Sequence, residues 1–162
     1  MITLHTLGTA EIEIGQTRIG PSSSRAFALL LYLCAERGRR VPRGTLQALL
    51  FRETSEPKAA HNLRQLLYRL RQMGVVLEGG SDFVAISASG IRDDYSDIQV
   101  SAPVFFSVVV PAIRGGVLPG YDPSFSRPYL EWLDHFRGGV AVGLLRTLSK
   151  GLEQTRREDN WV

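Results

Sequence analysis

Hydrogen-bond donors and positive charges are concentrated in one short stretch of the sequence, residues 61–72. Its polar members are His61, Asn62, Arg64, Gln65, Tyr68, Arg69, Arg71 and Gln72. Arginine can donate two hydrogen bonds to guanine, glutamine and asparagine can do the same to adenine, and all of them can donate to phosphate oxygens. The chemistry that this set could perform is therefore recognition of a nucleic acid.

Helical spacing places these side chains on one surface. Ser55 and Pro57 are typical of a helix start and Gly74 of a helix end, which predicts a helix over about residues 56–73. At about 100° per residue, one side of this helix is apolar and consists of Leu63, Leu66, Leu67, Leu70 and Met73. The polar set then lies on the opposite side, facing away from the core.

The charge of the chain is distributed unevenly. Residues 37–72 contain nine Lys or Arg and only two acids, Glu53 and Glu56, whereas the whole chain has a net charge of +3. The rest of the chain is therefore net acidic. A basic block on an acidic chain is typical of proteins that bind polyanions, and a solvated basic surface is the alternative interpretation.

The segments around this helix predict a small sheet and two further helices. Apolar residues alternate through residues 2–14, which predicts two or three short antiparallel strands. Serines at 22–24 predict the start of an apolar helix, and a short second helix fits residues 43–51. Residues 75–86 hold two apolar segments around a Gly-Gly-Ser-Asp turn, which predicts a hairpin. The predicted fold class is α+β, a winged helix with N-terminal antiparallel strands, three helices and a C-terminal β-hairpin wing, followed by an α-helical segment.

A boundary is predicted after this winged helix. Residues 87–97 are polar and carry an acidic cluster, which is typical of a linker. We therefore divide the chain into a winged-helix domain, residues 1–97, and a partial helical segment, residues 98–162.

The C-terminal segment gives a weaker pattern. Periodicity does not decide between helix and strand for the apolar run 103–113. From Pro128 onward, apolar residues at helical spacing predict a long amphipathic helix to about Arg157. Gly138 and Gly139 favour a kink or break in it, because each glycine costs about 1 kcal/mol relative to alanine in a helix interior.

Two motifs in this order resemble a known family. The string Asn-Leu-Arg-Gln-Leu-Leu-Tyr-Arg-Leu-Arg-Gln at residues 62–72 resembles the recognition helix of the antibiotic regulatory protein (SARP) family of transcription activators. Leu-Pro-Gly-Tyr-Asp at 118–122, followed by Tyr-Leu-Glu-Trp-Leu at 129–133, resembles the start of the bacterial transcriptional activator domain (BTAD), a tetratricopeptide-like helical array. The resemblance covers roughly residues 2–97 and 115–157.

The resemblance implies a bacterial, sequence-specific regulator that binds double-stranded DNA. The helix at about 56–73 would enter the major groove, with Arg69 making a base contact beside His61, Asn62, Arg64, Gln65, Tyr68 and Gln72. Candidates for phosphate contacts are Arg43, Thr45, Lys58 and Arg71. The hairpin turn departs from the family pattern because residues 78–83 hold no Lys or Arg, so Ser81 is its one candidate contact. RNA polymerase and a second copy of the chain are further expected partners, and the chain is expected to be a fragment of a longer regulator.

Other functional classes find little support in the sequence. The spacing of His5, His61 and His135 does not match that of metal ligands. Cys34 lies in an apolar run, which predicts that it is a core residue. We expect no enzymatic activity, no cofactor and no bound metal. No apolar run is long enough for a membrane span and no signal-peptide pattern is present, so the cytoplasm is the expected location.

The alternative hypothesis is a protein-interaction module. In this interpretation the winged helix and the helical segment dock an acidic partner such as polymerase, without specific DNA readout. The absence of a basic residue in the predicted wing favours this alternative.

Overall fold

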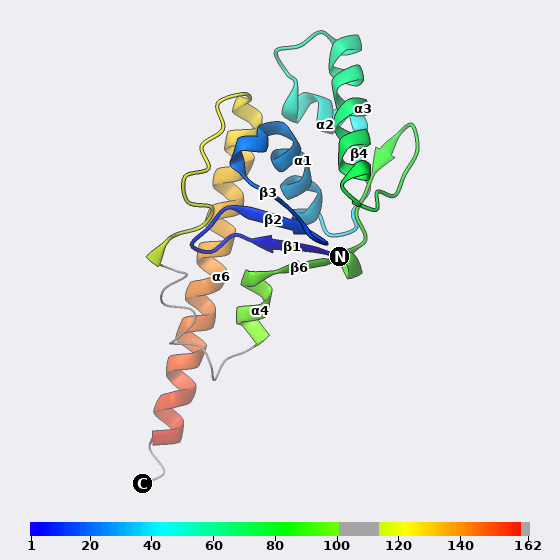
Figure 1. The fold of residues 1–162 in the computed structure, drawn as a ribbon. Helices are drawn as coiled ribbons and strands as arrows, with labels where there is room; N and C mark the ends of the chain where they lie inside the picture. The colour runs from blue at the N-terminus through cyan, green and yellow to red at the C-terminus, as the bar shows by residue number, and fades with distance from the viewer. Residues whose placement is uncertain (101–113, 160–162) are drawn as a thin grey trace.

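The computed structural model describes residues 1–100 and 114–159 and has a mixed α+β architecture (Figure 1). Strands β1 (Ile2–His5), β2 (Glu11–Ile14) and β3 (Thr17–Ile19) are antiparallel neighbours, as the alternation predicts. Their alternate residues are buried and form one side of the core. A fourth strand, β6 (Ile91–Asp93), pairs in parallel with β1, so that the sheet order is β3-β2-β1-β6.

The prediction of a linker at residues 87–97 is wrong. A short 3-10 helix, η2 (Ala88–Gly90), leads into β6, which is followed directly by helix α4 (Asp94–Val100). The Asp94 carboxylate accepts hydrogen bonds from the Thr6 amide and hydroxyl and from the Leu7 amide, at 2.7–2.8 Å. The acidic cluster therefore attaches this stretch to the end of β1. The division of the chain into two domains at residue 97 stays a prediction.

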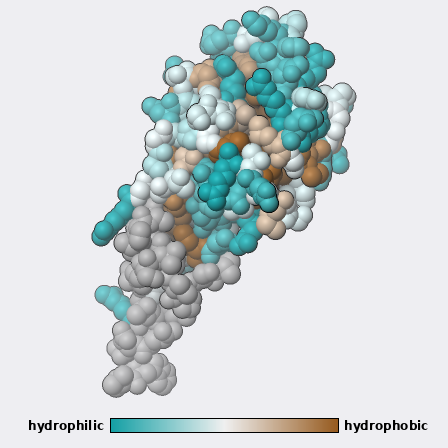
Figure 2. Space-filling model, viewed as in Figure 1, coloured by the Kyte–Doolittle hydropathy of each residue, from teal (hydrophilic) through white to brown (hydrophobic). Residues whose placement is uncertain are grey.

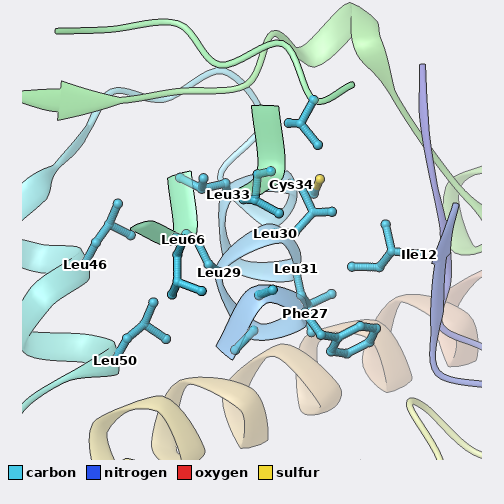
Figure 3. Packing of buried hydrophobic residues seen from close by; sticks show 14 of the residues in the cluster. Ile12, Phe27, Leu29, Leu30, Leu31, Leu33, Cys34, Leu46, Leu50 and Leu66 are labelled. Atoms are coloured by element: carbon cyan, nitrogen blue, oxygen red, sulfur yellow. The ribbon is translucent and has the colours of Figure 1, made fainter. Parts of the chain in front are cut away.

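Three helices share the core with the sheet. They are α1 (Ser24–Ala35), which follows the 3-10 helix η1 (Pro21–Ser23), α2 (Arg43–Leu50) and α3 (Glu56–Gln72). Helix α1 is apolar on nearly all sides and lies at the centre of the core, where Phe27 and Leu29 to Leu31 are fully buried. Figure 3 shows Leu46 and Leu50 from α2, Leu66 from α3 and Ile12 from the sheet gathered around it.

The segment after α3 closes on itself and on the start of α2. Glu78 and Ala85 form an isolated antiparallel bridge with two backbone hydrogen bonds of 2.9 Å. Beyond this bridge, β5 (Phe83–Val84) pairs with β4 (Val41–Pro42) rather than with residues 75–78. The chain thus turns at residues 79–82, as predicted. Strand β4, which precedes α2, holds this turn together with the Glu78–Ala85 bridge.

A single helix, α6 (Arg127–Asp159), runs through the C-terminal part. It continues through Gly138 and Gly139, so the predicted break does not occur. It packs against α2 and α4, and the ring centre of the half-buried Trp132 lies 5.0 Å from that of Tyr32 in α1. Tyr129 and Leu133 belong to the same core as the sheet. The prediction for residues 103–113 lies outside the described residues. In the part of the chain that the structure describes, no helix is both long enough and apolar enough to cross a membrane.

Candidate nucleic-acid interface

Helix α3 separates its polar and apolar residues as the spacing predicts. Leu63, Leu66, Leu67 and Leu70 are buried under it. The opposite side is open to solvent and carries Lys58, His61, Arg64, Gln65, Tyr68, Arg69, Arg71 and Gln72, with Asn62 half-buried at its edge. In Figure 2, hydrophilic atoms gather at the upper end of the molecule, where Figure 1 places α2 and α3.

The basic side chains of α3 have no acidic partners among residues 1–100 and 114–159. Exposed arginines elsewhere, such as Arg18 and Arg127, form ion pairs with nearby glutamates. Arg64, Arg69 and Arg71 form none with any described residue. Their charges are therefore not neutralised by the described part of the molecule, and they can attract an external anion.

A depression of about 480 Å³ lies on one side of α3, between this helix and the start of α2. Arg43 of α2 lines it, together with Arg64, Tyr68 and Arg71 of α3. Of the described residues that line it, none is acidic. Three guanidinium groups therefore surround one hollow without a compensating carboxylate.

A second depression, of about 610 Å³, lies on the other side of α3. It is lined by Asn62 and Arg69 of α3 and by residues 22–25 at the start of α1. Gln65 lines both depressions. The described lining of this hollow likewise includes no acid.

Arg25 is a residue of this surface that the sequence did not single out. Its guanidinium carbon lies 5.4 Å from the ring centre of Phe51 and 5.1 Å from that of Phe125. Its Nε donates a hydrogen bond to the Leu50 carbonyl at 3.3 Å. The serine-rich stretch before it indicated a helix start, but nothing local to the sequence places that start beside α3.

Arg43 has a structural role in addition to any contact with a ligand. Its Nε donates to the Gly80 carbonyl at 2.9 Å, and its backbone amide donates to the Asp82 carbonyl at 2.9 Å. Arg43 therefore holds the 79–82 turn against the first residue of α2. It is half-buried and still lines the first depression.

The remaining candidates are exposed but lie outside both depressions. They are Thr45, Lys58, His61, Gln72 and Ser81. The Ser81 hydroxyl donates to the Asp82 carboxylate at 2.7 Å. The turn thus presents an acid beside its one candidate contact, which leaves α3 and its two flanks as the cationic surface.

The described residues include no group of His, Cys, Asp and Glu that could hold a metal ion. Cys34 is buried in the core, and burial raises the pKa of its thiol from about 9.0 to about 12. The thiol is therefore protonated at neutral pH and is a poor nucleophile.

Comparison with models of protein families, with curated proteins and with solved structures found no match for the chain.

Proposed function

We propose that the chain binds double-stranded DNA sequence-specifically as part of a bacterial transcription regulator, with α3 lying in the major groove. The observation that carries this proposal is the pair of depressions on the two sides of α3, whose described lining residues include five arginines and no acid. An α-helix with its side chains is about 10–12 Å across, and the major groove of B-form DNA is about 12 Å wide. A helix with cationic flanks on both sides matches a groove with phosphates on both sides.

The mechanism joins electrostatic attraction with groove readout. Arginines that approach phosphates release counterions from the DNA, which supplies affinity without sequence preference. Side chains on the outermost part of α3 then reach base edges, which supplies specificity. The proposed fold is a winged helix, since three helices are followed by a turn that is closed by the Glu78–Ala85 bridge. Its turn carries no cation, so we assign no minor-groove contact to it.

The proposal extends to setting and partners. A regulator of this kind acts where the bacterial chromosome lies, which places the chain in the cytoplasm. A monomeric surface of this size covers a short site, so tight binding calls for tandem sites or a second copy of the chain. RNA polymerase is the partner through which an activator would act.

A protein-interaction module remains the second candidate. The turn lacks the cation that a wing would present to DNA, and docking of an acidic protein on α3 does not need a cation there. Anisotropy titrations of the full chain on labelled duplexes at several salt concentrations separate the two. If the chain binds DNA, the logarithm of its association constant should fall linearly with the logarithm of the salt concentration. Replacing Arg64 and Arg71 together by Gln should reduce the slope by about 2, since each phosphate contact contributes about 0.9.

The matched control is Arg146→Gln, which removes an exposed arginine of α6, remote from α3. It should leave the slope unchanged. Absence of binding to any duplex at low ionic strength, or equal slopes for the wild type and the Arg64/Arg71 variant, would contradict DNA binding through α3.

A further inference from the structure

The arginines of α3 lie on its two flanks rather than along its outermost line. Arg64 and Arg71 line the depression on the α2 side, whereas Arg69 lines the one on the α1 side. Gln65 lines both, so it lies between them on the crest of the helix. A helix that enters a groove brings its crest to the groove floor and its flanks to the walls. The floor of the major groove displays base edges, and the walls are phosphate backbones.

Arg25 is the second cation of the α1-side depression, and its guanidinium is held in place. The rings of Phe51 and Phe125 lie within 5.4 Å of it, and the Leu50 carbonyl accepts a hydrogen bond from its Nε. The ring contacts orient the group while it keeps its charge. The described lining residues include two guanidinium groups, Arg25 and Arg69, and no acid. Such a site would have its charge balanced by an anion from outside.

We infer that Arg25 and Arg69 together hold a phosphate of one DNA strand, while Arg43, Arg64 and Arg71 meet the backbone of the other strand. Gln65, on the crest, reads a base. This inference rests on the proposed DNA binding and refines it. It assigns Arg69 to the backbone, in contrast to the base contact that the sequence predicts, and it adds Arg25 to the interface.

The first test compares Arg69→Ala with Gln65→Ala in the full chain. Each variant is titrated with a duplex selected by the wild type from a random pool and with a random-sequence duplex, at several salt concentrations. Arg69→Ala should weaken binding to both duplexes by the same factor and reduce the salt slope by about 0.9. Gln65→Ala should weaken binding to the selected duplex alone, by roughly 5-fold to 150-fold, and leave the slope unchanged.

The second test places a negative charge in the depression without disturbing the fold. Ser23 is the N-cap residue of α1 and lines this depression, and its side chain makes no capping hydrogen bond. Aspartate is a favourable N-cap residue, so Ser23→Asp should preserve α1. It should weaken binding to both duplexes by tenfold or more, because the new carboxylate repels a phosphate held there. Ser149→Asp, at an exposed serine of α6, is the matched control and should bind as the wild type does.

The outcomes distinguish this inference from the function on which it rests. If the wild type binds DNA but Arg69→Ala loses affinity only for the selected duplex, Arg69 reads a base and the inference is overturned. Unchanged binding of Ser23→Asp also overturns it, because no phosphate then lies in the depression. If selection gives no consensus, the role of Gln65 is rejected. If the wild type binds neither duplex, the proposed function fails, and this inference with it.

Discussion

A pair of buried tyrosines should make a measurable contribution to the packing of α6 on the rest of the molecule. The Tyr121 hydroxyl donates a hydrogen bond to the Tyr129 hydroxyl at 3.1 Å, and the two residues are 2% and 0% exposed. Tyr129→Phe removes the acceptor and leaves a buried donor without its partner. The expected loss is about 1–3 kcal/mol of the free energy of unfolding. Replacing both tyrosines by Phe removes donor and acceptor together and should be close to neutral.

This comparison is a double-mutant cycle. Urea unfolding of the wild type, Tyr121→Phe, Tyr129→Phe and the double variant gives the interaction energy directly. Trp132 is a convenient fluorescence probe because its ring centre lies 5.3 Å from that of Tyr129. In thermal unfolding, each 1 kcal/mol should lower Tm by roughly 2–4 °C in a chain of this size. If the effects of the two single substitutions add in the double variant, the hydrogen bond contributes nothing and the reasoning is refuted.

Three further predictions follow from other parts of the structure. Asp94→Ala removes the acceptor of three hydrogen bonds at the end of β1 and should cost about 1–3 kcal/mol of unfolding free energy, measured by urea denaturation. Cys34 should react with a thiol reagent at pH 8 only when the protein is unfolded. Burial raises the pKa of this thiol from about 9.0 to about 12, so the unfolded state loses the proton at a lower pH than the folded state. The contribution of this group to the free energy of unfolding should therefore be fully present below pH 9 and be lost as the pH rises towards 12. Unfolding at graded alkaline pH, compared with that of Cys34→Ala, measures this loss. Arg43→Lys keeps the charge but loses the hydrogen bond to Gly80, so hydrogen exchange of the Ala85 amide should become faster.

Local periodicity was sufficient to predict α1, α2, α3 and α6, but not α4. The apolar spacing and the flanking Ser55, Pro57 and Gly74 predicted helix 56–73, and the structure has Glu56–Gln72. The pattern after Pro128 predicted α6 in the same way. These signals are sufficient because a helix forms all its backbone hydrogen bonds within one segment, so its sequence alone carries the pattern.

Pairings between distant segments could not be predicted. Strand β6 has only three residues in a polar stretch, and its partner β1 lies about ninety positions earlier, at Ile2 to Leu4. No local pattern specifies such a partner. For the same reason, the sequence did not predict that Arg25 belongs to the candidate interface. Its place beside Arg69 arises from the packing of α1 on α3.

The glycines of α6 show both the strength and the limit of propensity arguments. A Cβ at Gly143 would clash with the Tyr95 side chain, so any larger residue there would require the Tyr95 ring of α4 to move. A Cβ at Gly138 or Gly139 would meet nothing within 4 Å, and nothing in the structure explains these two. The helix continues through them because its packing against α2 and α4 outweighs a cost of about 1 kcal/mol per glycine.

Helix α6 is anchored at one end and extends beyond the body of the molecule at the other (Figure 1). At its base, the Ser126 hydroxyl donates to the Leu49 carbonyl at 2.5 Å, next to the Arg25 contact with Phe51 and Phe125. With 33 residues at 1.5 Å each, the helix is about 50 Å long. Because the base of the helix is bonded to Leu49 and Arg25 is bonded to Leu50, any displacement of α6 at this end would also displace the last turn of α2 and the Arg25 site.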